Sequence, residues 1–204
     1  MNCQRLYDRM APFYASAMRL FPMWLRYAQQ ALPWLDQKKA VLEIGPGPGV
    51  LLEQITRDHP LAVGVDLSLG MLRYTRCRLL RQDLTPRPVQ ANAITLPFAG
   101  DTFDGIVLTF VFSAIPDGPA ALCEMYRVLH PRGVVALIDA CVPRDGNLVA
   151  RGLGRLWALF GDRLRDEAAL MRAAGFEIVE CKEYGAFHSI RLTVASKMYC
   201  RRLE

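Results

Sequence analysis

The sequence has few histidines and none of the common cysteine motifs. Its three histidines are scattered, and its six cysteines form no Cys-x-x-Cys pair. Neither a zinc knuckle nor a redox dithiol is therefore indicated, and we expect no metal site. Unpaired cysteines are typical of a reducing compartment, so the expected location is the cytoplasm.

Long apolar runs are absent as well. No uncharged apolar stretch approaches the roughly 18 residues that span a bilayer. The first residues, Asn2 to Arg5, do not begin the apolar segment that secretion requires. There is also no low-complexity linker and no internal repeat. With 52% apolar residues in 204, we expect one domain that spans residues 1–204.

The chain has fewer acidic residues than basic ones, 20 against 25, which gives a formal charge of +5. Most of this excess lies between residues 68 and 88, where five arginines accompany one acid, Asp83. These arginines are Arg73, Arg76, Arg78, Arg81 and Arg87. A solvated helix face is the ordinary interpretation, but the excess also permits attraction to phosphate or to an anionic surface.

Short apolar runs alternate with helical patterns, as in repeated βαβ units. Strands are predicted at Ala40–Ile44, Ala62–Asp66, Val89–Asn92, Phe103–Thr109 and Gly133–Asp139, and helices at Val50–Asp58, Ser68–Cys77, Pro119–Leu129 and Glu167–Ala174. Two last strands, Phe176–Tyr184 and Ile190–Ala195, are too close for a parallel crossover and are predicted to be antiparallel. The expected fold is doubly wound α/β, with a seven-stranded, mostly parallel sheet whose last strand is antiparallel.

Two segments lie outside this alternation. Residues 1–35 are predicted to form a helical arm rich in aromatic residues, and residues 143–165 a helical insertion. We expect both to cap the same domain.

A glycine-rich turn follows the first strand. Gly45, Gly47 and Gly49 alternate with two prolines, directly before a predicted helix. Glycines let a ligand approach the backbone, and the carboxyl edge of such a sheet is where nucleotides bind. A dinucleotide fingerprint requires a further glycine where this chain has Val50, and the prolines remove amides that a pyrophosphate would use.

Asp66 ends the second strand, 21 residues after Gly45. Its two oxygens suit both hydroxyls of a ribose. Helix capping is the alternative, because Ser68 follows and both residue types cap helices.

Together these motifs resemble the methyltransferase family typified by the ubiquinone/menaquinone biosynthesis C-methyltransferase, over nearly the whole chain. The matching residues are Tyr7, Asp8, Ala11 and Tyr14; Glu43 to Gly49; Gly64 to Ser68 with Met71 and Leu72; Leu96 to Phe98 with Phe103 and Asp104; and Arg127 to Gly133. The resemblance implies a class I fold and S-adenosyl-L-methionine (AdoMet) as cofactor. AdoMet has no pyrophosphate, which agrees with the glycine turn.

The resemblance also implies roles for single residues. Glu43 would hold the methionine ammonium, and Gly45, Gly47 and Gly49 would flank the aminoacyl chain. Asp66 would bind the ribose. The remaining cofactor contacts would be Tyr14 from the arm, Leu67, Met71, Asn92 and Ala93 around the adenine, and Thr109 and Phe110 near the sulfonium.

Three positions depart from the family pattern. Asn92 stands where the family often has an acid, so its contact with the adenine amino group would be weaker. Ser113-Ala114 replaces a frequent histidine pair, which removes the obvious base. Arg132 occupies a glycine position of the family's Pro-Gly-Gly turn.

Methyl transfer requires chiefly that the acceptor be aligned and water excluded, and a base only where a proton must leave. Tyr7 and Tyr14 are candidates to stabilise the sulfonium through their ring faces, or they simply attach the arm to the core. His188, in the turn between the last two strands, is the candidate near the pocket mouth, with an ordinary surface role as the alternative. No catalytic base is assigned.

The apolar arm and insertion predict a small-molecule acceptor that is apolar or aromatic, such as a quinone precursor or a lipid-like compound. Arginines beside these aromatics permit peripheral membrane contact, whereas nothing indicates nucleic acid as acceptor. The oligomeric state is expected to be monomer or homodimer. Two alternatives remain: a catalytically weak AdoMet-binding protein that acts through a partner, and a nicotinamide-dependent oxidoreductase.

Overall fold

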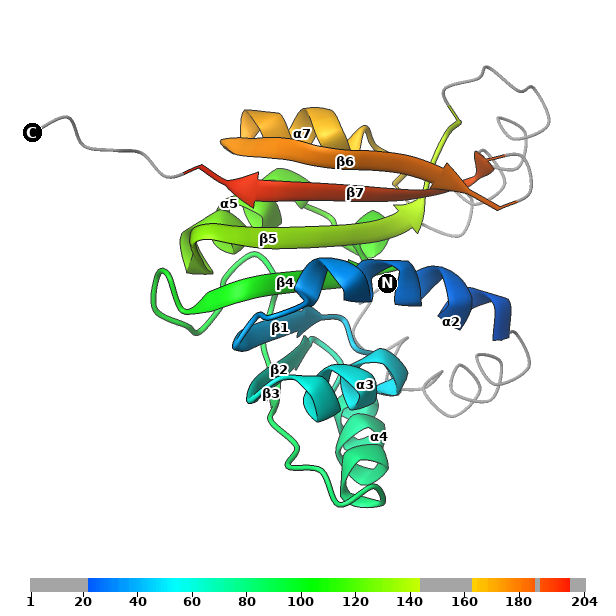
Figure 1. The fold of residues 1–204 in the computed structure, drawn as a ribbon, viewed down its shortest axis with the longest axis vertical. Coiled ribbons are helices and arrows are strands. Elements are labelled where there is room, and N and C mark those ends of the chain that lie inside the picture. Colours follow the sequence, from blue (N-terminus) through cyan, green and yellow to red (C-terminus); the bar gives the residue numbers. More distant parts are fainter. Residues whose placement is uncertain (1–21, 144–162, 186–187, 199–204) are drawn as a thin grey trace, which may run out of the picture.

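The structure is a computed structural model that describes residues 22–143, 163–185 and 188–198. Its centre is a seven-stranded sheet in the order β3-β2-β1-β4-β5-β7-β6 (Figure 1). The strands are β1 (Ala40–Ile44), β2 (Leu61–Asp66), β3 (Pro88–Gln90), β4 (Phe103–Thr109), β5 (Leu129–Ala140), β6 (Phe176–Tyr184) and β7 (Ile190–Lys197). Only β7 runs against its neighbours, β5 and β6, so the predicted sheet is confirmed.

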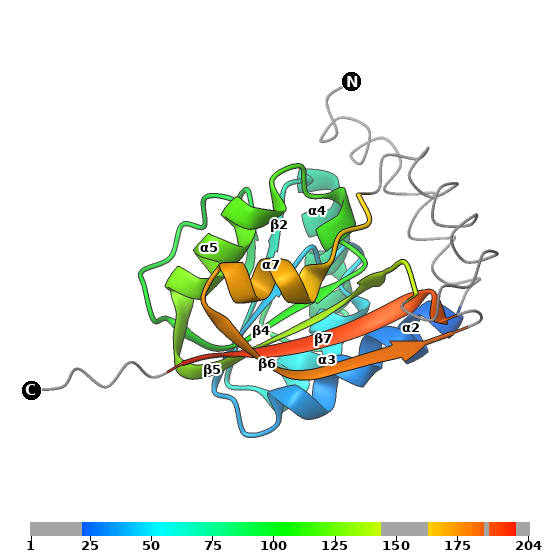
Figure 2. The ribbon, with the colours of Figure 1, turned by 90° about the horizontal axis from the view of Figure 1, so that it is seen from above.

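Helices cover both faces of the sheet. They are α2 (Pro22–Ala28), η1 (Gln29–Leu35), α3 (Val50–Asp58), α4 (Leu69–Leu80), η2 (Phe112–Ala114), α5 (Gly118–Val128) and α7 (Glu167–Ala173). Figure 2 shows α5 and α7 on one side of the strands and α2 and α3 on the other. Two buried apolar clusters fill these layers, one beneath α5 and α7 and the other beneath η1 and α3.

Several predicted strand boundaries differ from the observed ones: β2 begins one residue earlier, β7 ends two residues later, and β3 and β5 differ at both ends. β5 begins at Leu129 instead of Gly133, because Leu129 is fully buried and pairs with Phe103 before the register shifts. Arg132 adopts a left-handed φ of 67° at this irregularity.

β3 ends at Gln90 instead of Asn92. The backbone turns there, and Asn92 forms an isolated bridge with Thr95 while its side-chain oxygen accepts a hydrogen bond from the Ile94 amide at 3.2 Å. The third strand is therefore shorter than its apolar run indicates.

The strand order places a switch point at the centre of the sheet. From β1 the chain moves outward to β2 and β3, and then crosses to β4 on the other side of β1. Ligands of doubly wound folds bind at the carboxyl edge beside such a reversal. The glycine turn after β1 and the loop after β4 meet at this edge.

The arm is helical where the structure describes it, in α2 and η1. The rest of the arm, with Tyr7 and Tyr14, lies outside the described residues, and so do residues 144–162 of the insertion. No helix in the described ranges is long and apolar enough to cross a bilayer.

Candidate active site

The glycine turn has a backbone conformation that ordinary residues avoid. Gly45, Gly47 and Gly49 have φ values of 69°, 52° and 76°, in the left-handed region where glycine carries no steric penalty. A Cβ on Gly45 would lie 2.5 Å from a methyl of Val111, in the loop after β4. The glycines therefore serve both the turn and its close approach to that loop.

Side chains of α4 hold the same turn from the other side. The Thr75 hydroxyl donates to the carbonyl of Gly47 at 2.8 Å. Arg78 donates to the carbonyl of Pro48 at 3.1 Å and forms an ion pair with Glu53 at 3.0 Å. Sequence reasoning missed this support, although Thr75 is a polar residue on the buried side of an otherwise apolar helical pattern.

Asp66 lies opposite the turn, at the end of β2. Its Oδ2 accepts from the Gly47 amide at 3.3 Å and its Oδ1 accepts from the Ser68 amide at 2.9 Å. Ser68, and not Asp66, caps α4, because its hydroxyl accepts from the Met71 amide. Asp66 is thus outside the helix, at the carboxyl end of β2.

Glu43 is the most unusual ionisable group at this edge. It is 1% exposed, and its Oε2 has no hydrogen-bond partner among the described residues. Burial, reinforced by the negative charge of Asp66, raises its pKa from 4.5 to about 8. A buried, unpaired carboxyl beside a nucleotide-type turn requires a donor or a cation from elsewhere, and a ligand ammonium group meets that requirement.

The residues expected around an adenine differ in exposure. Met71 and Ala93 are buried, whereas Leu67 is 41% exposed and Asn92 is exposed. Of these four residues, Leu67 and Asn92 are accessible to solvent, and Met71 and Ala93 are part of the packed interior.

The end of β4 is organised by an aromatic contact. Phe110 has a left-handed φ of 55°, which is costly for a residue with a side chain. Its ring packs edge-on against Trp24 of α2, with centroids 4.5 Å apart. Thr109 remains within the β4–β5 pairing, and Val111 lies against Gly45 of the glycine turn.

A second polar group, not identified from the sequence, lies beyond η2. Asp139, 2% exposed near the end of β5, accepts from the amide of Ser113 at 2.7 Å and from its hydroxyl at 3.0 Å. Arg165 donates to the carbonyls of Ile115 and Pro116, both at 2.8 Å. The sequence signal that could have identified Asp139 was an acidic residue at the end of an apolar strand, at the carboxyl edge of the sheet.

His188 and Cys141 lie close together at the same edge. The Cys141 thiol donates to the His188 carbonyl at 3.3 Å, and burial raises the pKa of this thiol to about 12. The thiol is therefore neutral and unreactive at physiological pH. His188 itself is exposed, in the connection between β6 and β7, as expected from its position.

The structure thus brings Glu43, the three glycines and Asp66 together in one site, with Thr109 on the adjacent strand. Tyr7 and Tyr14 are outside the described part of the chain. Within that part, no group of His, Cys, Asp or Glu side chains is arranged to hold a metal ion.

Sequence comparisons identify relatives of this chain. A family model described as a methyltransferase domain matches residues 42–137. The chain is 31% identical over 156 residues to the 2-phytyl-1,4-naphtoquinone methyltransferase of Thermosynechococcus vestitus, covering 72% of this chain and 68% of that protein. It is also 31% identical over 147 residues to the demethylmenaquinone methyltransferase of Thermus thermophilus, covering 69% and 67%.

Another relative is longer. The ubiquinone/menaquinone biosynthesis C-methyltransferase of Geobacter sulfurreducens is 30% identical over 150 residues, which cover 69% of this chain and 58% of that protein. This chain thus spans less than two thirds of that relative.

Solved structures show the same fold at low sequence identity. The [4+2]-cyclase SpnF superposes with a TM-score of 0.74 at 16% identity, covering 96% of this chain and 95% of that one. A SAM-dependent methyltransferase from Thermotoga maritima superposes with a TM-score of 0.73 at 20% identity, covering 95% and 99%. The chain belongs to the class I AdoMet-dependent methyltransferases, in the family that includes the demethylmenaquinone and ubiquinone/menaquinone biosynthesis methyltransferases.

Proposed function

We propose that this chain transfers the methyl group of AdoMet to a small apolar or aromatic acceptor of the quinone-precursor class. Two relatives named above act on naphthoquinone compounds according to their names. The observation that carries the proposal is the buried carboxyl of Glu43, at the edge where the cofactor turn lies, with one oxygen that has no hydrogen-bond partner among the described residues. This supports binding of a cationic nucleoside.

The residues of the site fit AdoMet group by group. Glu43 would accept from the methionine ammonium, and Asp66 would accept from the ribose hydroxyls. Gly45, Gly47 and Gly49 leave room for the aminoacyl chain against the backbone. When bound, AdoMet supplies a methyl group already activated by its sulfonium.

The protein's own contribution to the reaction is alignment and exclusion of water. Thr109 and Phe110 would border the methyl group, and the contact between Phe110 and Trp24 holds that border in place. Tyr7 and Tyr14 remain candidates to contact the sulfonium, and His188 remains a candidate at the pocket mouth. No catalytic base is assigned. The carboxylate of Asp139 is not chosen for this role, because it already accepts two hydrogen bonds from Ser113.

A second candidate function, an AdoMet-binding protein with weak catalysis that acts through a partner, is favoured by one observation. The Asn92 oxygen, expected to receive the adenine amino group, already accepts from the Ile94 amide. The cyclase SpnF also illustrates that this fold hosts different reactions. The nicotinamide alternative has no comparable support, since Val50 stands where a glycine is required.

Calorimetric titration with AdoMet, with its demethylated product and with NAD tests the cofactor. We expect the two sulfur nucleosides to bind and NAD to give no heat. A subsequent assay with methyl-labelled AdoMet and a reduced demethylnaphthoquinone should transfer label to the organic phase.

The outcomes separate the two candidates. AdoMet binding without transfer to any quinol would support the partner-dependent alternative. Failure of both nucleosides to bind at millimolar concentration would refute the proposed function. Glu177→Gln, on the exposed part of β6, is the matched control for the substitution Glu43→Gln in the site.

A further inference from the structure

The outer face of α4 combines exposed apolar and basic residues. Leu69, Arg73, Arg76, Cys77 and Leu80 follow each other at helical spacing on the side opposite the buried Met71, Leu72, Thr75 and Leu79. We call these five residues the α4 stripe. Leu69 is 42% exposed and Leu80 is 51% exposed.

The stripe carries positive charge that the rest of the described chain does not neutralise. α4 contains no Asp or Glu, so its arginines have no acidic neighbour three or four residues away on the helix. In the described ranges no ion pair involves Arg73, Arg76 or Arg81, whereas Arg78 is paired with Glu53. Arg73 and Arg76 are themselves three residues apart, a spacing at which like charges repel.

Solvated helix faces commonly carry acidic and basic residues together. A face whose arginines have no ion-pair partner among the described residues, and which also carries exposed leucines, matches instead the chemistry of helices that lie at a lipid interface. There the guanidinium groups meet anionic headgroups, and the aliphatic side chains enter the boundary of the acyl region. Tyr74, 40% exposed beside the stripe, suits the same interface.

We propose that the α4 stripe is a docking surface for an anionic lipid bilayer. The helix lies at the end of the sheet formed by β2 and β3, far from α7 and β6 at the other end (Figure 1). Its amino end follows directly from Ser68 beside the cofactor site, so docking through the stripe brings that site close to the bilayer surface. This inference concerns the surface alone and does not depend on the acceptor.

A nucleic acid would also be attracted to the arginines. However, exposed Leu69 and Leu80 contribute nothing to phosphate binding, and they would remain in water beside a nucleic-acid backbone. The leucines therefore distinguish the two partners, and the experiment uses them.

Flotation of the purified chain with vesicles tests the proposal. We expect retention on an equal mixture of phosphatidylcholine and phosphatidylglycerol, and none on phosphatidylcholine alone. The double variant Arg73→Glu/Arg76→Glu should weaken binding by at least about tenfold, since each arginine contributes about fivefold near such a surface. Leu80→Ser should weaken it by about threefold or more, since burial of even one CH₂ contributes roughly fourfold.

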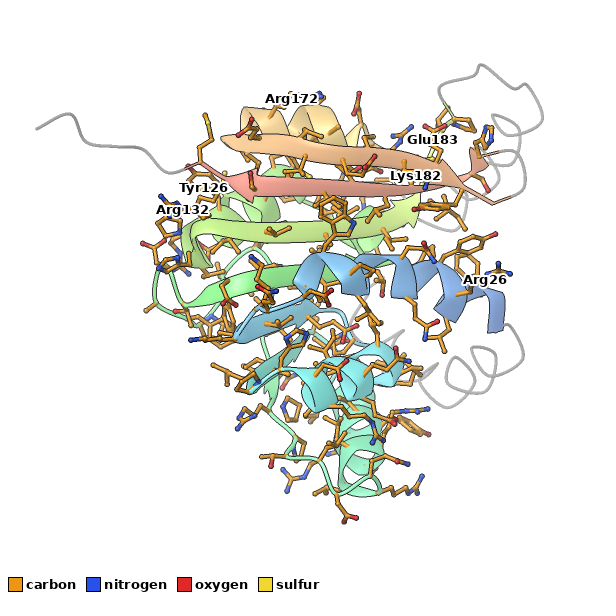
Figure 3. All side chains as sticks on the ribbon, in the orientation of Figure 1. Arg26, Tyr126, Arg132, Arg172, Lys182 and Glu183 are labelled. Carbon is orange, nitrogen blue, oxygen red and sulfur yellow. The ribbon has the colours of Figure 1, made fainter. Side chains whose placement is uncertain are left out.

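Matched controls lie on other elements, away from α4. Arg132→Glu/Arg172→Glu changes the net charge equally, at β5 and α7 (Figure 3), and Val179→Ser removes an exposed apolar side chain from β6. Both should change retention by less than about twofold, the scale expected of a distant surface charge at physiological salt. Unchanged AdoMet binding and melting temperature would show that each variant is folded.

Three results would overturn the proposal. The first is no retention on the anionic vesicles. The second is equal loss in the stripe variants and the matched controls. The third is binding of a labelled single-stranded RNA that Leu80→Ser leaves intact, without vesicle retention, which would assign the stripe to nucleic acid.

Discussion

At the scale of single residues, Glu43 links cofactor binding to protonation. Because its pKa is about 8 without ligand, most molecules carry a protonated Glu43 at neutral pH. A ligand ammonium group favours the ionised form, so binding should release a proton. The apparent affinity for AdoMet should therefore rise as pH increases toward 8, and it should fall at higher pH, where the ligand ammonium itself loses its proton.

Glu43→Gln tests this linkage. We expect AdoMet affinity to fall by roughly tenfold to a hundredfold, the cost of losing a hydrogen bond to a charged group, and the pH dependence to disappear. Calorimetry in buffers of different ionisation enthalpy measures both effects. Proton release that persists in the variant would show that another group is responsible.

The same residue affects the stability of the ligand-free protein. Its pKa is raised above that of the unfolded chain, so between about pH 4.5 and 8 the native state retains a proton that the unfolded state has released. The free energy of unfolding should therefore decrease as pH rises through this window. In Glu43→Gln the decrease should be smaller, as urea denaturation at several pH values would show.

Gly45 provides a steric prediction. In Gly45→Ala, the left-handed backbone should cost about 1–2 kcal/mol, and the added Cβ would contact Val111 at 2.5 Å. The combination with Val111→Ala should recover only the steric part of this loss. Denaturation of the two single variants and the double variant separates the two contributions, and full recovery would contradict the role of φ.

At the scale of secondary-structure elements, a buried ion-pair cluster joins α7, β6 and β7. Arg191, with its side chain 5% exposed, pairs with Glu167 at 3.1 Å and with Glu183 at 2.7 Å. It also donates to the Val142 carbonyl at 2.8 Å, where the chain leaves β5. One guanidinium thus connects the residues on both sides of the 144–162 segment. Burial raises the pKa of Glu167 to about 7, even though Arg191 opposes the shift.

Arg191→Met should therefore be destabilising by about 3–5 kcal/mol, because the buried carboxylate of Glu167 and the partly buried one of Glu183 lose their cation. The triple variant that adds Glu167→Gln and Glu183→Gln should recover most of this stability, because the unpaired charges are then removed. Chemical denaturation measures each variant. No recovery in the triple variant would mean that the guanidinium contributes mainly through packing.

At the scale of the whole molecule, one sheet serves both apolar clusters. Each strand from β1 to β7 other than β3 contributes a buried residue to at least one of them, and several contribute to both faces. A core shared in this way cannot lose one layer without exposing the other.

We therefore expect residues 1–204 to unfold in a single cooperative transition. The calorimetric and van't Hoff enthalpies should agree, and AdoMet at about a hundred times its Kd should add about 2.7 kcal/mol. Differential scanning calorimetry with and without AdoMet checks this. Two resolved transitions would instead indicate two domains.

Local sequence patterns determined the order and type of the elements in this protein. Apolar runs, Gly45 to Gly49 and the acid at position 66 are local signals, because strand pairing and a tight turn depend on neighbouring residues. For the same reason the glycine turn and Asp66 could be assigned to one site before any contact was known.

Long-range packing decided the rest. β5 extends to Leu129 because Leu129 pairs with Phe103 on another strand, and Thr75 supports the cofactor turn from 28 residues away. The burial of Glu43, the Ser113–Asp139 pair and the exposure of the α4 stripe likewise depend on which segments meet in space. Burial and the choice of hydrogen-bond partners are properties of the folded chain, and only the tertiary structure could show them.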